Sequence, residues 1–229
     1  MKYLIIIFVI AAFTFSSCSV KNMSDREEGI LIQNYQTFAI QISDFETAGD
    51  LMDFLSDKYC TQKSKNWPFM FFDMKSKSMT NTSNRNTIKI GIEPPPCVQG
   101  RYDDRMVLEI MKDGYNTEIE RFITEVDSIP SYVEKQMLSF GANPNYAVGA
   151  LNNGIWLTTK RNDKLKNLNP YIYKIIQGYI SSVRKYSLMA FNKKIDELSD
   201  EEYKEIAHEF NFRLSFKYSD KPIELNVVN

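Results

Sequence analysis

The chain contains few of the residues on which common catalytic and cofactor sites depend. It has one histidine, three cysteines and nine glycines among 229 residues. A nucleophilic site with a histidine base would have to use His208, which lies in an acidic segment beside Glu209 and is interpreted as a surface residue. The sequence has no HExxH, paired CxxC or GxSxG motif and no phosphate-binding loop. We therefore expect no catalytic residue, no cofactor and no metal.

Charge of either sign is not in excess. Lys and Arg number 28 against 29 Asp and Glu, which leaves a net charge of −1. Such a balance provides no broad basic surface to hold nucleic acid or to press the protein body onto anionic lipid, so we predict no nucleic-acid partner. Carboxylates are numerous, but those in residues 196–209 are most simply the solvated face of a capped helix.

The longest apolar run, residues 3–15, is followed by Ser16, Ser17 and Cys18. The run is too short for a comfortable membrane span and fits the hydrophobic core of a signal peptide. It resembles a bacterial lipoprotein signal over residues 1–18, which implies cleavage before Cys18 and a lipid on its sulfur. The alternative is an uncleaved N-terminal anchor. Both interpretations place the following residues outside the cytoplasm, with one end held at a membrane.

The two remaining cysteines, Cys60 and Cys97, lie in a compartment where disulfides persist. If joined, they would close a long loop and stabilise the fold by about 3–4 kcal/mol. The alternative is a pair of free, buried thiols, because the sequence does not fix the distance between them.

The body of the chain divides into parts of different composition. Residues 19–29 are polar and are expected to form a tether. Residues 30–100 form a first α+β segment that ends with Pro94, Pro95 and Pro96, which cannot continue a central strand. Residues 101–229 form the second part. With 43% hydrophobic and 13% aromatic residues, the chain is rich enough in apolar side chains to bury a core.

Hydrophobic periodicity predicts an α+β fold, a small sheet with helices packed mainly on one face. Strands are expected over residues 35–42, 67–74, 88–92, 106–112, 118–126, 155–159 and 213–218. Helices are expected to begin near capping residues Ser43, Ser128, Asn169 and Ser199, with Glu46 and Glu202 completing capping boxes, and Gly141 is placed to end the second helix. Gly178 interrupts the long helix and costs about 1 kcal/mol relative to alanine, unless close packing requires it.

The segment 186–214 resembles the C-terminal end of a subgroup of ExbD/TolR biopolymer transport proteins. Those proteins have a long helix, an aromatic-Gly-Lys turn, a "DEL" sequence, and a capped helix of mixed charge before a last strand. Here the turn is Phe191, Asn192 and Lys193, and the "DEL" is Asp196, Glu197 and Leu198. Asparagine replaces glycine, and both residues can take the left-handed conformation that such a turn uses. Weaker similarity extends the resemblance to about residues 88–218.

The resemblance implies an ExbD/TolR-like periplasmic domain over residues 101–229. The chain also departs from the family in one respect. The membrane helix of the family carries an acidic residue on its proton path. Residues 3–15 contain no Asp or Glu. Proton transduction is therefore not expected of this chain. What the resemblance implies is a non-enzymatic accessory or binding subunit of a TonB- or Tol-type energy-transduction system, lipid-anchored in a Gram-negative cell envelope and facing the periplasm.

Partners implied by the resemblance are ExbB/ExbD- or TonB-like envelope proteins, with peptidoglycan as a further ligand. Family soluble domains commonly form dimers, so the resemblance also implies a homodimer, or a heterodimer with a true ExbD/TolR subunit. The alternative is a lipoprotein enzyme or a cell-wall-binding lipoprotein that acts on envelope polymers, suggested only by the compartment and the many carboxylates.

Two surface features and two tryptophans leave alternatives open. Four basic residues form either a patch for wall polymer or a partner, or a rim that balances the acidic helix: Arg184, Lys185, Lys193 and Lys194. The last strand alternates Leu214, Phe216 and Tyr218 with polar residues and offers an edge for pairing, unless Lys217 and residues 220–222 blunt that edge. Trp67 and Trp156 are expected to be core anchors.

Overall fold

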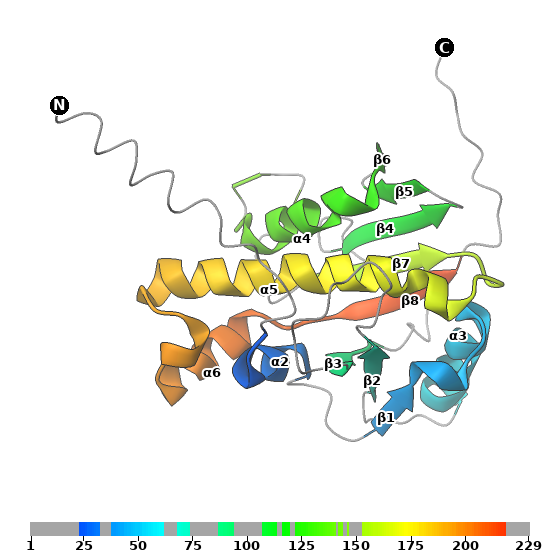
Figure 1. The fold of residues 1–229 in the computed structure, drawn as a ribbon, viewed down its shortest axis with the longest axis horizontal. Coiled ribbons are helices and arrows are strands. Elements are labelled where there is room, and N and C mark those ends of the chain that lie inside the picture. Colours follow the sequence, from blue (N-terminus) through cyan, green and yellow to red (C-terminus); the bar gives the residue numbers. More distant parts are fainter. Residues whose placement is uncertain are drawn as a thin grey trace, which may run out of the picture.

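The predicted α+β fold class is confirmed by the computed structural model, which contains both helices and β-sheets (Figure 1). The structure describes residues 23–32, 38–61, 68–73, 87–93, 107–113, 116–119, 122–140, 142–143, 146 and 153–218. Its main elements are α2 Asp25–Ile32, β1 Phe38–Gln41, α3 Ala48–Ser56, β2 Pro68–Asp73, β3 Thr87–Gly91, β4 Val107–Asp113, β5 Asn116–Ile119, β6 Phe122–Thr124, α4 Ile129–Leu138, β7 Gly154–Thr159, α5 Asn169–Phe191, α6 Asp200–Glu209 and β8 Leu214–Tyr218.

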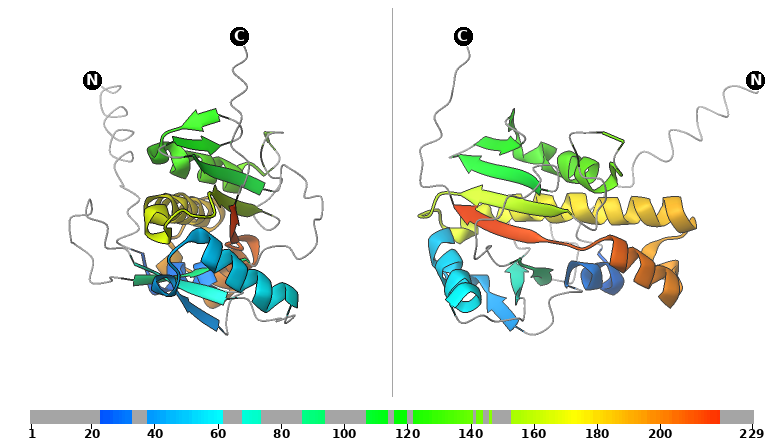
Figure 2. Two further views of the ribbon diagram at one scale, coloured as in Figure 1. Left: turned by 90° about the vertical axis from the view of Figure 1, so that its right-hand side faces the viewer. Right: turned by 180° about the vertical axis from the view of Figure 1, so that it is seen from behind.

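The strands form two sheets. The larger has the order β6-β5-β4-β7-β8, and the smaller has the order β1-β2-β3. In the larger sheet β4, β7 and β8 run parallel to one another, whereas β4 and β5 are antiparallel, with Asp113 opposite Asn116. Parallel neighbours need long crossover connections, and here these contain helices. Figures 1 and 2 show α4 and α5 on one face of this sheet.

The core lies between that face and the helices. Alternate residues of β4, β7 and β8 point inward and are almost fully buried: Leu108, Ile110, Ile155, Leu157, Leu214 and Phe216. The apolar stripe of α5 packs against them. Its residues are buried in the same hydrophobic cluster: Ile172, Ile175, Ile176, Tyr179 and Val183. A period of two in the strands and of 3.6 in the helix places both apolar sets on one side, so this layer follows from the sequence pattern.

Gly178 lies where α5 crosses α4. A Cβ atom at this position would be 2.7 Å from the carbonyl oxygen of Pro130 and 2.8 Å from Cβ of Val133. Both distances are shorter than van der Waals contact, so a side chain at this position would force the two helices apart. Close packing therefore accounts for glycine in the middle of a long helix.

The two parts predicted on either side of residue 100 share one core. A single hydrophobic cluster contains buried residues from both parts. The smaller sheet also joins the larger one, because the N–H of Glu93 donates to the carbonyl oxygen of Leu214 at 2.8 Å, and Ile92 bridges Leu214 in a parallel arrangement. The Glu93 carboxylate accepts hydrogen bonds from Arg213 and Ser215. The first segment is thus packed onto β8.

The predicted tether over residues 19–29 is wrong from Met23 onward. Met23 is buried, and helix α2 begins at Asp25 and buries Glu27, Ile30 and Leu31. The polar composition misled the prediction because the charge of Glu27 is neutralised by a residue far away in the sequence, and because one short helix needs only one apolar side. Residues 19–22 lie outside the described part of the chain.

The helix that was expected to begin near Ser43 is α3, and it begins later than predicted. Residues Ile42–Asp44 form a 3₁₀ turn, and the capping box is made by Thr47 and Asp50 rather than by Ser43 and Glu46. The Thr47 hydroxyl accepts the N–H of Asp50 at 3.2 Å, and the Asp50 carboxylate accepts the N–H of Thr47 at 2.9 Å. Both pairs have capping-box spacing, so the local pattern alone does not decide between them.

Other differences concern turns and ends. The single strand expected over residues 118–126 is divided into β5 and β6. Ser128 precedes α4, but its hydroxyl donates to the carbonyl oxygen of Glu125 at 2.7 Å instead of capping the helix. After α4 the residue with positive φ is Phe140, at 45°, and the expected terminator Gly141 lies outside the described residues.

Candidate functional site

The segment 186–214 forms the end of α5, a tight turn, α6 and the start of β8. Asn192 follows α5 with φ 53° and ψ 34°, and its N–H donates to the carbonyl oxygen of Leu188 at 3.1 Å. The left-handed conformation expected of this residue is therefore confirmed. Asparagine tolerates that conformation because its short polar side chain can form local hydrogen bonds.

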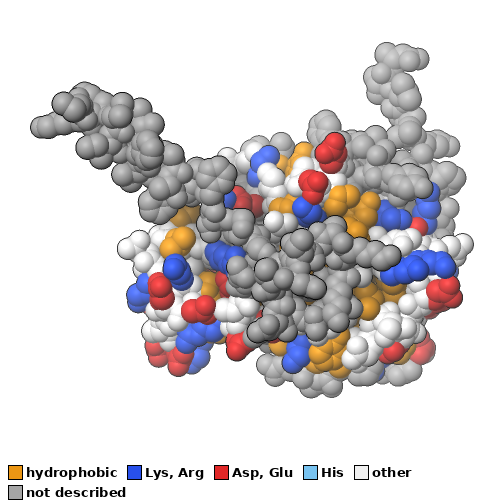
Figure 3. Space-filling model, in the orientation of Figure 1, with side chains coloured by type: hydrophobic (Ala, Val, Ile, Leu, Met, Phe, Trp, Pro, Cys, Tyr) orange, Lys and Arg blue, Asp and Glu red, His pale blue; other side chains and the backbone are white. Residues whose placement is uncertain are grey.

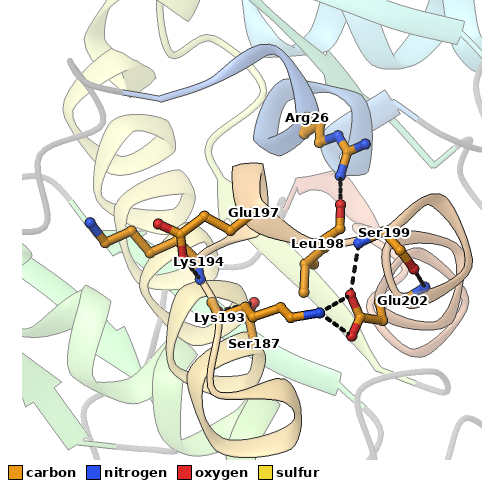
Figure 4. Close-up of polar contacts among 8 residues, drawn as sticks. All are labelled: Arg26, Ser187, Lys193, Lys194, Glu197, Leu198, Ser199 and Glu202. Atoms are coloured by element: carbon orange, nitrogen blue, oxygen red, sulfur yellow. Dashed lines mark hydrogen bonds and ion pairs between the residues drawn. The ribbon is translucent and has the colours of Figure 1, made fainter.

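The turn and the cap of α6 form one polar network, shown in Figure 4. The Lys193 ammonium group contacts both carboxylate oxygens of Glu202, at 2.7 and 2.9 Å. The Ser187 hydroxyl donates to the carbonyl oxygen of Lys193 at 2.7 Å. The predicted capping box of α6 is confirmed, because the N–H of Ser199 donates to Glu202 and the N–H of Glu202 donates to Ser199. We call this network, with the ends of α5 and α6, the α5–α6 junction.

Helix α2 is bound to the α5–α6 junction (Figure 4). The Arg26 guanidinium donates to the carbonyl oxygen of Leu198 at 2.6 Å and pairs with Asp200 at 2.9 Å. The Glu27 carboxylate accepts from Arg184 at 2.6 and 2.9 Å. These residues are 172, 174 and 157 positions apart in the chain. These contacts were not predicted, because no local spacing in the sequence indicates a pair of residues so far apart.

The pKa of Glu202 is lowered, chiefly by the hydrogen bond from Lys193 and then by the N–H of Ser199. A lowered carboxylate pKa contributes stability that is present above the unfolded-state pKa and is lost as the pH falls through the folded-state pKa. We expect Lys193→Met to raise the pKa of Glu202 toward its ordinary value. The variant should also lose part of the stability that the lowered pKa contributes above the acid range. Carbon NMR of the carboxyl group as a function of pH measures the shift.

The neighbouring exposed lysine, Lys194, provides the matched control for that titration. Among the described residues, Lys194 bonds to an acidic side chain through its backbone alone, because its N–H donates to the Glu197 carboxylate at 3.0 Å. Lys194→Met should therefore leave the pKa of Glu202 unchanged. Equal pKa shifts in the two variants would show that general charge, and not the Lys193 hydrogen bond, sets the titration of Glu202.

The four basic residues of the predicted patch are mostly engaged by carboxylates. Arg184 pairs with Glu27, Lys185 pairs with Glu134 at 2.5 Å, and Lys193 pairs with Glu202. This favours the interpretation of the four as a charge-balanced rim over that of a polymer-binding patch. The acidic partners differ from those expected, because only Lys193 pairs with α6 while the other two pair with α2 and α4.

The last strand is confirmed as an edge of the larger sheet. Its inward residues Leu214 and Phe216 are buried, and Leu214 is already bridged to Ile92. The Lys217 ammonium lies 4.7 Å from the ring centroid of Trp156 and 3.2 Å from the Glu109 carboxylate. Pairing with a second chain stays a prediction, and it is restricted to the part of β8 from Phe216 to Tyr218.

The cysteine predictions have separate outcomes. Cys60, in the π-helical turn after α3, is disulfide-bonded. The free-thiol alternative therefore does not apply to it. Cys97 and Cys18 lie outside the described residues, so the pairing of Cys60 with Cys97 and the lipidation of Cys18 both stay predictions.

His208 is exposed on α6, as expected for a surface residue, and Trp156 is only partly buried, so it is less of a core anchor than predicted. Trp67 lies outside the described residues.

Within the described part of the chain, no three His, Cys, Asp or Glu residues are grouped so that they could hold a metal ion. Its helices also include none that is both long and apolar enough to cross a membrane.

An open pocket of about 420 Å³ lies beside α4. It is lined by Glu134, Lys135, Leu138, Ser139, Ala142, Asn143 and Tyr146. Its carboxylate, Glu134, accepts from the Ser181 hydroxyl at 3.1 Å and from Lys185. The pocket therefore combines one engaged carboxylate with one lysine, an arrangement typical of a surface hollow.

An exposed apolar group, which was not predicted from the sequence, lies near the α5–α6 junction. Leu188 is 51% exposed and Met189 is 75% exposed at the end of α5, and Phe140 is 41% exposed after α4. The Phe140 ring lies 5.8 Å from the ring of Tyr186. A signal was present, because Leu188 and Met189 lie beyond Val183, the last buried apolar residue of α5.

Comparisons of the chain with protein-family models, with curated proteins and with solved structures found no match.

Proposed function

We propose that this protein is a lipid-anchored, non-enzymatic component of a Gram-negative cell envelope and serves as an accessory or binding subunit of a TonB- or Tol-type energy-transduction system. The lipid is attached at Cys18, and the folded part faces the periplasm. Its partners are ExbB/ExbD- or TonB-like envelope proteins, with peptidoglycan as a further ligand.

The observation that carries this proposal is the form of residues 186–214. The ExbD/TolR resemblance implies a long helix, a left-handed turn, a capped helix and a last strand, and the chain has these elements in this order. Asn192 takes the left-handed conformation at the position where the family has glycine. Agreement in local structure supports the fold relation, and a functional relation needs a test of its own.

That test is the recovery of partners from membranes. Full-length protein with a C-terminal affinity tag is crosslinked gently in cell envelopes and purified, and the bound proteins are identified by mass spectrometry. We expect ExbB/ExbD-like or TonB-like subunits to be enriched. Recovery of none of them would overturn the proposed partnership.

Cys18→Ala is the control for the anchor. This variant should leave the membrane fraction or remain as an unprocessed precursor, and it should lose the partners, because the anchor holds the domain near them. Membrane retention with unchanged size and no lipid label would instead show that residues 3–15 are an uncleaved anchor.

No specific observation in the described residues favours the alternative of an enzyme or cell-wall-binding lipoprotein that acts on envelope polymers. The carboxylate of the open pocket, Glu134, is already bonded to Lys185 and Ser181. The same purification tests this alternative, since recovery of peptidoglycan fragments without protein partners would favour it.

A further inference from the structure

The end of α5 carries apolar side chains that are largely exposed. Leu188 and Met189 are exposed, whereas the apolar residues of α5 from Ile172 to Val183 are mostly buried. Phe140 adds a third exposed apolar residue from the chain after α4, in contact with Tyr186 of α5. Figure 3 shows hydrophobic side chains at the surface over this end of α5, next to lysine and arginine side chains. We call Phe140, Leu188 and Met189 the apolar tip.

The chain enters the folded part beside this same end of α5. The N–H of Ser24 donates to the Glu27 carboxylate at 2.9 Å, and Glu27 is held by Arg184. Leu188 lies one helical turn beyond Arg184 on the same side of α5, about 6 Å along the helix axis. Met23, immediately before Ser24, is already buried in the core. The N-terminal connection therefore begins within a short distance of the apolar tip.

The connection is short enough to fix how the domain faces the membrane. Only residues 19–22 separate Cys18 from the buried Met23. Because an extended chain advances at most about 3.6 Å per residue, a lipid-bearing Cys18 lies within roughly 18 Å of Met23. Helix α5 has 23 residues and is about 34 Å long, so its N-terminal end lies much farther from the anchor.

We infer that the apolar tip is a membrane-contacting surface, with Phe140, Leu188 and Met189 inserted into the lipid interface next to the anchor. The inference rests on the anchored protein of the proposed function and adds the orientation of the domain. The occupant of this surface is the bilayer in which the chain itself is anchored, because the tether brings that bilayer to this end of α5.

The charges around the apolar tip indicate apolar rather than electrostatic attachment. Three of the four basic residues at this end of α5 are engaged by carboxylates of the protein: Arg184 by Glu27, Lys185 by Glu134 and Lys193 by Glu202. A charge-balanced rim gives little attraction to anionic headgroups, whereas exposed Leu, Met and Phe side chains gain by entering the interface. The contact should therefore form on zwitterionic lipid and persist at high salt.

Fluorescence quenching by brominated lipid tests the orientation. Full-length, lipid-modified Met189→Trp protein is reconstituted into vesicles of brominated phosphatidylcholine and compared with the same protein in unbrominated vesicles. The native signal, from Trp67 and Trp156, is subtracted with the unsubstituted protein. Since interfacial side chains reach about 5–10 Å into the headgroup and acyl boundary, the added tryptophan should lose about half of its emission.

Asn167→Trp is the matched control. Asn167 is exposed in the 3₁₀ turn before α5, about 30 Å along the helix from Met189, and should remain unquenched. Both positions are exposed, so neither tryptophan needs room in the core.

Flotation of the vesicles separates the outcomes. The inference is supported if the protein floats with the vesicles and only the tryptophan at position 189 is quenched. The same result is expected at high salt. Protein that floats with equal or no quenching at the two positions overturns the membrane-contacting surface while leaving the anchor and partner proposals intact. A dimer by crosslinking, with position 189 unquenched, assigns the apolar tip to a second copy and also overturns the inference. Protein that does not float overturns the anchor itself.

Discussion

Arg184→Met should lower the free energy of unfolding by about 3 kcal/mol, because it leaves a buried carboxylate without its counterion. The side chain of Glu27 is only 6% exposed, and that of Arg184 is 26% exposed. Without Arg184, the N–H of Ser24 is the one donor among the described residues that bonds to the Glu27 carboxylate. Methionine keeps the apolar stem of arginine, so the variant tests the charge more than the packing. Urea unfolding followed by circular dichroism measures the change.

Two further variants isolate the ion pair. Lys185→Met removes the adjacent ion pair with Glu134, in which the Lys185 side chain is 53% exposed and the Glu134 side chain is 29% exposed. Because this pair is exposed, its loss should lower the free energy of unfolding by less than about 1 kcal/mol. The double variant Glu27→Gln with Arg184→Met should recover about 1–2 kcal/mol relative to Arg184→Met, since it removes the uncompensated charge. Equal losses for Arg184→Met and Lys185→Met would show that burial of Glu27 is not what makes this contact important.

Gly178→Ala should destabilise the protein by about 1–3 kcal/mol, although alanine is the better helix former. The added Cβ would lie 2.7 and 2.8 Å from backbone atoms of Pro130 and 2.8 Å from Cβ of Val133, and backbone cannot move aside as the end of a flexible side chain can. The expected consequence is a displacement of α4 against α5, seen as a lower melting temperature.

The control compares the same two residues where the helix is open to solvent. At the exposed position 189, alanine should be more stable than glycine by about 1 kcal/mol, the ordinary helix preference. At position 178 the order should be reversed. Greater stability of Gly178→Ala than of the natural protein would mean that α4 and α5 can separate without cost, contrary to the close contact of the two helices.

Patterns within a few residues of one another were predicted well from the sequence. The alternation in β4, β7 and β8 and the stripe of α5 place their side chains inward because strand and helix geometry fix the period. The capping box of Ser199 and Glu202 and the left-handed Asn192 were likewise predicted, since the groups involved are at most three or four residues apart. Where two local patterns compete, as for Ser43 and Thr47, the same reasoning fails.

The sequence by itself determined the α+β class, the long helix, and the cap and turn that follow it, because each depends on side-chain period or on contacts within one helical turn. Only the tertiary structure decided that residues 25–29 belong to a helix and not to a tether, because Glu27 depends on Arg184, 157 residues away. It alone joined Ile92 to Leu214. Such outcomes follow from which surfaces meet in space, and no local spacing encodes that meeting.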